Sequence, residues 1–317
     1  MRLILSVTVP IYLLIGVGWL LVKGGLFQKT EMRVLGRLVV MLCLPALVFT
    51  ALSQRSLAEV LHPSYLLAYA VGSVVAQGSM LLWQLKVRGR PIDEAALRGL
   101  GVSCSNSGFA GFPIAQQLLG PVAGVAMALN MVVENLLVIP TALALADSAG
   151  QSGRSFWSRL LESLKSLLRN PLIQAILAGG ACALIGWKPP EPVARTIELL
   201  SRASAPLALL MIGGTLAGLP LRPGLLHEVA QVVFGKLIVM PAAVFGMLSL
   251  LPPLDPPLRT AAVLFAAMPM LSVYPVLSQK YHQEDFSAAA LLATTLTSFF
   301  TISALIWAMG EQGGWLP

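Results

Sequence analysis

The sequence predicts an all-α polytopic membrane protein with ten transmembrane helices. Of its 317 residues, 56% are apolar and only 11% are Asp, Glu, Lys or Arg, whereas soluble domains carry about 25% charged residues. The mean hydropathy is +0.80. Because a membrane span needs about 20 mainly apolar residues, the chain supplies ten spans with short connectors. This composition excludes an ordinary soluble domain and indicates that lipid covers most of the surface.

Ten apolar windows, separated by charged residues, Pro and Gly, define the predicted spans. The first window is followed by Lys23 and not by a small-residue cleavage site, so we interpret it as a retained span and not as a signal peptide. The longest hydrophilic stretch follows the fifth window, and its second part, residues 156–168, is expected to form an amphipathic surface helix. The windows lie at residues 3–22, 34–53, 64–85, 96–119, 121–146, 171–187, 196–219, 225–251, 259–280 and 286–309.

The two halves of the chain show weak internal sequence similarity. Arg98 opens the fourth window and Arg259 opens the ninth, and Pro113 and Pro275 lie 15 and 16 residues beyond these arginines. Because each half holds an odd number of spans, the second copy is inverted relative to the first. Inverted repeats are typical of secondary transporters, whose substrate sites lie at the repeat interface near the bilayer midplane.

The predicted domains are a first five-helix repeat, residues 1–146, a cytoplasmic linker, residues 147–169, and a second five-helix repeat, residues 170–317. Of the 21 Lys and Arg residues, 14 fall on one side of the predicted membrane and 6 on the other, with Lys236 inside a span. Since cytoplasmic loops keep positive charge, both termini are expected on the non-cytoplasmic side of the cell (inner) membrane. The same rule accounts for the net charge of +7, so no nucleic-acid partner is expected.

The segment SNSGFAGFPI in the middle of the fourth window is a poor helix interior. Its glycines, proline and small polar side chains all weaken a continuous helix. Ser105, Asn106 and Ser107 are suited to cap a new half-helix whose first turn accommodates Pro113. The start of such a half-helix carries about half a positive charge, which suits a carboxylate or another anion.

The ninth window holds a second predicted break. In MPMLSVYP, Pro269 and Pro275 lie six residues apart and flank Ser272 and Tyr274. If the two broken helices cross, their half-helix ends meet at one point and form a substrate site. The alternative is that the prolines only kink continuous helices.

Glu134 is the only acidic residue deep inside a predicted span, and Lys236 is the only deep basic one. A charge at the bilayer centre costs at least about 2.5 kcal/mol, so such residues usually mark a functional path. Asn130 lies one helical turn before Glu134 and shares its face. Glu134 is either a proton-titrating site or a residue in a structural ion pair, for example with Lys236, or one hydrated near the interface. Lys236 either helps to hold an anion or packs helices.

Two glutamines are further candidates for coupling or support. Gln77 ends a polar stripe in the third window that also contains Tyr65, Tyr69 and Ser73, and this stripe should face protein or a water-filled cavity. Gln116 follows the first predicted break and either binds substrate or a cation, or packs.

No enzyme motif is present in the sequence. His227-Glu228 begins like a zinc-protease motif, but position 231 is Gln where the second histidine is required. The three cysteines lack a disulfide or metal-site spacing and are interpreted as core-filling residues. We therefore expect no metal site, no cofactor and no enzymatic activity.

Several of these stretches resemble the auxin efflux carrier (AEC) family, within the superfamily of bile-acid, arsenite and riboflavin-type transporters. SNSG followed five residues later by Pro is the most specific match. The matching stretches are LCLPALVFTAL from Leu42, SNSGFAGFPI from Ser105, NPLIQAILAGG from Asn170, APLALLMIGGTLAG from Ala205 and KLIVMPA from Lys236.

The resemblance implies two inverted five-helix repeats with crossed, broken helices four and nine, and an elevator-type carrier for organic anions. Asn106 and Pro113 match the family's first crossover. At the second crossover Ser272 and Val273 precede Tyr274, where many bacterial members place an Asn. A homodimer is suggested by analogy with the plant relatives.

The expected function is secondary active transport of a small organic anion, such as a carboxylate, with proton or sodium coupling. The alternative is a sodium-coupled symporter of the bile-acid type, and a remote alternative is a membrane sensor or an embedded enzyme.

Overall fold

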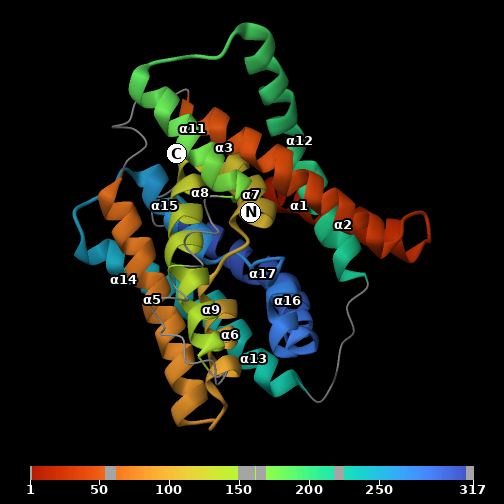
Figure 1. The fold of residues 1–317 in the computed structure, drawn as a ribbon, viewed down its shortest axis with the longest axis vertical. Helices are drawn as coiled ribbons and strands as arrows, with labels where there is room; N and C mark the ends of the chain where they lie inside the picture. Colours follow the sequence, from red (N-terminus) through yellow and green to blue (C-terminus); the bar gives the residue numbers. More distant parts are fainter. Residues whose placement is uncertain (1, 54–61, 149–160, 162–168, 218–224, 312–317) are drawn as a thin grey trace.

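The computed structural model describes residues 2–53, 62–148, 161, 169–217 and 225–311, and over these residues it is all-helical, without strands (Figure 1). Six helices are long and apolar enough to cross a membrane, namely those at Lys29–Ser53, Pro63–Lys86, Val122–Asp147, Glu191–Leu216, Leu226–Leu250 and Glu284–Gly310. The apolar helices Val9–Lys23 and Pro171–Ile185 are shorter. The chain is therefore a multi-pass membrane protein, while the count of ten spans stays a prediction.

The first half of the chain contains helices at each of the first five predicted windows. Its elements are α1 (Arg2–Lys23), α2 (Lys29–Leu38), η1 (Val39–Cys43), α3 (Leu44–Ser53), α5 (Pro63–Lys86), α6 (Ile92–Ser103), η2 (Ser107–Gly111), α7 (Phe112–Leu119), α8 (Val122–Val133), η3 (Glu134–Val138) and α9 (Ile139–Asp147).

The second half likewise has helices at the last five windows, and the expected surface helix at 156–168 falls almost wholly outside the described residues. The elements are α11 (Pro171–Ile185), α12 (Glu191–Leu216), α13 (Leu226–Phe234), η5 (Gly235–Val239), α14 (Met240–Leu250), α15 (Pro256–Ala266), α16 (Tyr274–Ser278), η6 (Gln279–Tyr281) and α17 (Glu284–Glu311).

Four of these elements, η1, η2, η3 and η5, are five-residue π-helical turns, each followed two residues later by proline. A proline lacks an N–H, and its ring clashes with the carbonyl of the preceding helical turn. A π turn is wider than an α turn and relieves this clash. In each of these turns the residue before the proline donates its N–H to the carbonyl five residues back. These donors and acceptors are Leu44 and Val39, Phe112 and Ser107, Ile139 and Glu134, and Met240 and Gly235.

The helices form two packing groups, which occupy the upper and lower parts of Figure 1. In the first packing group, α1 runs along α12, α2 also packs on α12, and α3 packs on α11 and α12. Close approach of α1 and α12 requires glycine, since a Cβ at Gly213 would lie 1.8 Å from the carbonyl oxygen of Ile15 and one at Gly18 would lie 2.1 Å from that of Leu210.

In the second packing group, α5 packs on α6 and α14, α9 packs on α6, and α13 packs on α17. Helix α8 contacts members of both groups, namely α3, α5 and α15. Most of the buried side chains in the described ranges are apolar, and the three cysteines, Cys43, Cys104 and Cys182, are buried as free thiols.

Candidate functional site

Two non-helical segments lie against each other between the packing groups. Helix α6 ends at Ser103 and η2 begins at Ser107, whereas α15 ends at Ala266 and α16 begins at Tyr274. We call residues 104–106 together with 267–273 the crossing.

Backbone hydrogen bonds join the two segments of the crossing in antiparallel orientation. Ser105 and Met270 form an isolated β-bridge. The Asn106 N–H donates to the Pro269 carbonyl at 2.8 Å, and the Leu271 N–H donates to the Cys104 carbonyl at 3.3 Å. These bonds satisfy backbone groups that the helices leave unpaired, which is a requirement at membrane depth.

Asn106 connects the two segments through its side chain as well. Its Nδ2 donates to the Ser272 hydroxyl at 2.5 Å, while its Oδ1 accepts from the Phe109 N–H at 3.3 Å. Asn106 is therefore the N-cap of η2, as the sequence predicted for this cluster. Pro113 lies in the first turn of α7, directly after the π turn of η2.

Glu134 is buried beside the crossing, with 3% of its surface exposed. Its Oε1 accepts three hydrogen bonds, from the Ser105 N–H at 3.1 Å, the Ser107 hydroxyl at 3.1 Å and the Tyr69 hydroxyl at 3.0 Å. Because a carboxylate is stabilised by such donors, Glu134 holds the backbone of the first segment in its non-helical form.

Lys236 binds the hydroxyl of the same serine. It is fully buried, and its Nζ donates to the Ser105 hydroxyl at 2.6 Å and to the Ala266 carbonyl at 3.1 Å. The Tyr69 hydroxyl lies 3.2 Å from the same Ser105 oxygen.

Among the described side chains, Glu134 and Lys236 form no direct ion pair with each other. Both charged groups bind Ser105 instead, Glu134 at its N–H and Lys236 at its hydroxyl, so the ion pair that the sequence left open as one alternative is not a direct one. Opposite charges that bind the same residue, one at its N–H and the other at its hydroxyl, lower the cost of burying both. We call Tyr69, Ser105, Ser107, Glu134 and Lys236 the polar cluster.

Asn130 and Gln77 extend this polar region away from the crossing. The Asn130 Oδ1 accepts from the Tyr65 hydroxyl at 3.0 Å, and its buried Nδ2 has no hydrogen-bond partner in the described part of the chain. Gln77 Nε2 donates to the Val138 carbonyl at 3.3 Å. The predicted stripe of the third window is buried throughout, so it faces protein as expected.

The last three predicted site residues, Tyr274, Pro275 and Gln116, also lie outside the polar cluster. Tyr274 is buried, but its hydroxyl donates to the Leu97 carbonyl at 3.0 Å, so it fastens α16 to α6. Pro275 begins α16 beside it. Gln116 is exposed near the end of α7.

Sequence reasoning missed the bridging role of Tyr69 and the π turns that carry Glu134 and Lys236. The available signal was the proline six residues after Glu134 and five after Lys236, since a proline inside a span demands a local change of hydrogen bonding. No group of three or more His, Cys, Asp or Glu side chains that could hold a metal ion occurs within the described ranges.

Comparisons with known proteins show the family of this chain. The sequence model of a family described as "Membrane transport protein" matches residues 3–307. The chain is 30% identical over 315 residues to a protein of Rhizobium meliloti (strain 1021) named "Putative malonate transporter", covering 99% of this chain and 98% of that one.

Two further relatives are named as transporters without a substrate. The "Uncharacterized transporter YfdV" of Escherichia coli (strain K12) is 25% identical over 304 residues, which cover 94% of each chain. An "Uncharacterized transporter" of Methanothermobacter thermautotrophicus is 28% identical over 250 residues, or 77% of this chain and 76% of that one. The chain therefore belongs to the membrane transport protein family and is a membrane transporter, not an enzyme.

Proposed function

We propose that this protein is a secondary active transporter that moves a small organic anion, such as a carboxylate, across the cell membrane through the crossing. The crossing itself carries the proposal. Non-helical backbone at membrane depth is tolerated only where protein buries it or where it lines a water-filled cavity, and transporters use such interrupted helices to bind substrate. The relative named for malonate supports a carboxylate substrate.

The anion is proposed to bind where η2 begins. The first turn of a helix presents N–H groups without intrahelical partners and a partial positive charge. Asn106 and Ser272, which now bind each other at 2.5 Å, would exchange that bond for bonds to a carboxylate. Ser105 and Ser107 lie beside them, while Pro113, Tyr274 and Pro275 shape the two breaks.

We further propose the inverted-repeat, elevator-type organisation, in which broken helices four and nine belong to the moving part. Ion pairs within the second packing group support it, because Arg98 of α6 binds Glu228 of α13 at 2.5 Å and Lys280 binds Asp147 at the end of α9. Such ion pairs connect helices of the second packing group, as expected if these helices move together. Orientation of the termini outside the cytoplasm, homodimerisation and the wider superfamily relation stay predictions.

Energetics constrain the coupling. Moving one charge through 100 mV is worth about 2.3 kcal/mol, so a cell that is negative inside expels a monoanion but imports it only together with a cation. Glu134 is proposed as the residue that binds the coupled proton. Asn130, Lys236 and Gln77 are proposed as supporting residues around it. The alternative, sodium coupling, is separated by replacing sodium in the assay with choline.

The test is uptake of radiolabelled malonate, malate and indole acetate into proteoliposomes. Asn106→Asp keeps an oxygen for the Phe109 N–H but places a negative charge at the proposed anion site, so we expect at least about a tenfold loss of uptake. Gln117→Glu, which adds the same charge on the exposed surface of α7, is the matched control and should transport normally. Equal uptake by both variants would contradict the proposed site.

A further inference from the structure

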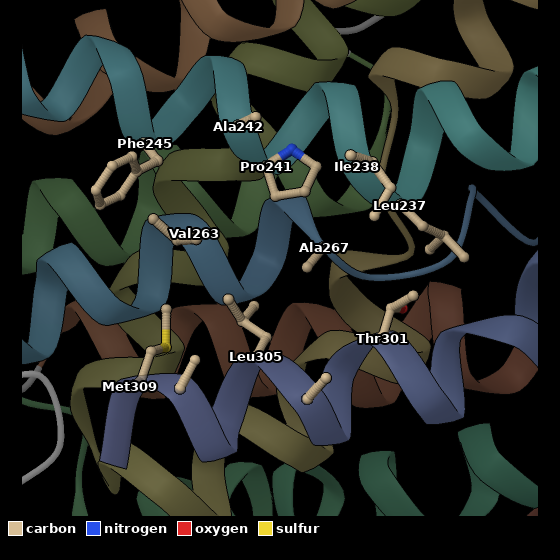
Figure 2. Close-up of a pocket in the computed structure, with 12 residues that line it drawn as sticks. Leu237, Ile238, Pro241, Ala242, Phe245, Val263, Ala267, Thr301, Leu305 and Met309 are labelled. Carbon is tan, nitrogen blue, oxygen red and sulfur yellow. The ribbon is translucent and has the colours of Figure 1, made fainter. Parts of the chain in front are cut away.

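An apolar groove lies between η5, α14, α15 and α17, in the second packing group (Figure 2). Its volume is about 390 Å³, within the range of ligand pockets in proteins. Thr301 supplies its one hydroxyl. The lining residues are Leu237, Ile238, Pro241, Ala242, Phe245, Val263, Ala267, Thr301, Ala304, Leu305, Ala308 and Met309.

Small side chains hollow out this groove. Ala304 and Ala308 are spaced by one turn on α17, and Ala242 faces them from α14. Larger neighbours form its rim, with Ile238 exposed by 47% and Phe245 by 44%. In a membrane protein, apolar side chains exposed on the surface of a span face lipid, so the groove opens toward the bilayer.

A positive charge lies at one end of the groove. Figure 2 shows Phe245 and Met309 at one end and Leu237 and Thr301 at the other. Arg259 lies one helical turn before Val263 on α15, and its Cζ is 5.9 Å from the centroid of the Phe245 ring. Arg259 and Ser249 also line a second cavity of about 260 Å³.

The groove is long enough to span most of one leaflet. Eight residues separate Leu237 from Phe245 at its two ends, which corresponds to about 12 Å along a helix, and half of the hydrocarbon core is about 15 Å thick. The loop at residues 251–255 ends α14 on the side of Arg259, so the charged end lies at the interface and the apolar end lies deeper.

We propose that this groove binds a phospholipid, with one acyl chain along α14 and α17 and its phosphate at Arg259. The apolar lining excludes the small carboxylate as its ligand, because a carboxylate would lose its hydration without gaining polar partners. An acyl chain loses no hydration when it moves from lipid into the groove. Arginine, in turn, is well suited to bind phosphate oxygens. The lipid site does not depend on which substrate the protein carries. It adjoins the crossing, because Ala267 lines the groove and the carbonyl of the preceding residue, Ala266, accepts a hydrogen bond from Lys236.

Native mass spectrometry of the purified full chain, titrated with phosphatidylglycerol, tests the proposal. We expect one tightly held lipid on the unmodified protein. Ala308→Trp fills the groove and should weaken this binding at least tenfold, and Arg259→Gln should weaken it about tenfold or more by removing a charge-assisted bond. Leu296→Trp, on an exposed part of the same helix, is the matched control and should bind like the unmodified protein.

Diacylglycerol, which lacks the phosphate, should bind the unmodified protein as weakly as phosphatidylglycerol binds Arg259→Gln. Equal binding of the two lipids, or unchanged binding by both Ala308→Trp and Arg259→Gln, would overturn the proposal. A loss of dimer by Ala308→Trp with lipid binding unchanged would instead identify the groove as a subunit interface and would also overturn it. Should Ala308→Trp not fold, Ala304→Leu and Arg259→Gln supply the same comparison.

Discussion

Replacing Lys236 by methionine tests whether its charge stabilises Glu134 through Ser105. Methionine keeps an unbranched chain of similar length but removes the ammonium group, which donates to Ser105 at 2.6 Å and to the Ala266 carbonyl at 3.1 Å. The Glu134 carboxylate would then remain buried without its nearby positive charge. The perturbation therefore acts on both the hydrogen bonds and the charge balance.

The expected cost follows from these contacts. Hydrogen bonds to a charged group contribute about 1.5–3 kcal/mol each, and removing one partner of a buried charged pair costs about 3–5 kcal/mol. A loss of this size would lower the unfolding midpoint by about 6–20 °C, at 2–4 °C for each kcal/mol in proteins of 150–250 residues. Glu134→Gln should cost less, because the amide oxygen still accepts from Tyr69 and Ser107.

The assay is a double-mutant cycle by thermal unfolding in detergent at one scan rate. The double variant Glu134→Gln with Lys236→Met buries no charge at this position, so it should be more stable than the sum of the single losses implies, by about 1–3 kcal/mol. Additive losses, within about 0.5 kcal/mol, would refute coupling through Ser105.

Three further predictions use the same purified protein. Glu134→Gln should flatten the pH dependence of uptake between about pH 5.5 and about pH 8, as expected when the residue that exchanges the coupled proton is lost; an unchanged profile would reject Glu134 as the coupling site. Tyr69→Phe should cost about 1–3 kcal/mol of stability by removing the hydroxyl shared by Ser105 and Glu134, and a loss below about 0.5 kcal/mol would contradict that role. Gly213→Ala should destabilise by about 3 kcal/mol or more, because its Cβ would meet a backbone oxygen at 1.8 Å, whereas the control Gly180→Ala meets open space and should be neutral or stabilising by up to about 1 kcal/mol.

The sequence predicted the membrane character and the elements of this fold because both depend on local composition. Helices lie at each predicted window, and the poor helix-forming run at Ser105–Ser107 coincides with the end of α6 and the cap of η2. The π turns escaped prediction. A proline in a span demands some local adjustment, but whether a helix kinks, breaks or widens depends on the packing around it.

By itself, the sequence determined that lipid surrounds the chain, that two deep charges need partners, and that a small set of polar residues interrupts the fourth window. These properties follow from the cost of placing charge and unpaired backbone groups in hydrocarbon, which holds for any fold. Only the tertiary structure decided which partners meet. Glu134 and Lys236 lie 102 positions apart in the sequence, and packing alone brought both to Ser105, while the hydroxyl of Tyr274 was turned toward Leu97.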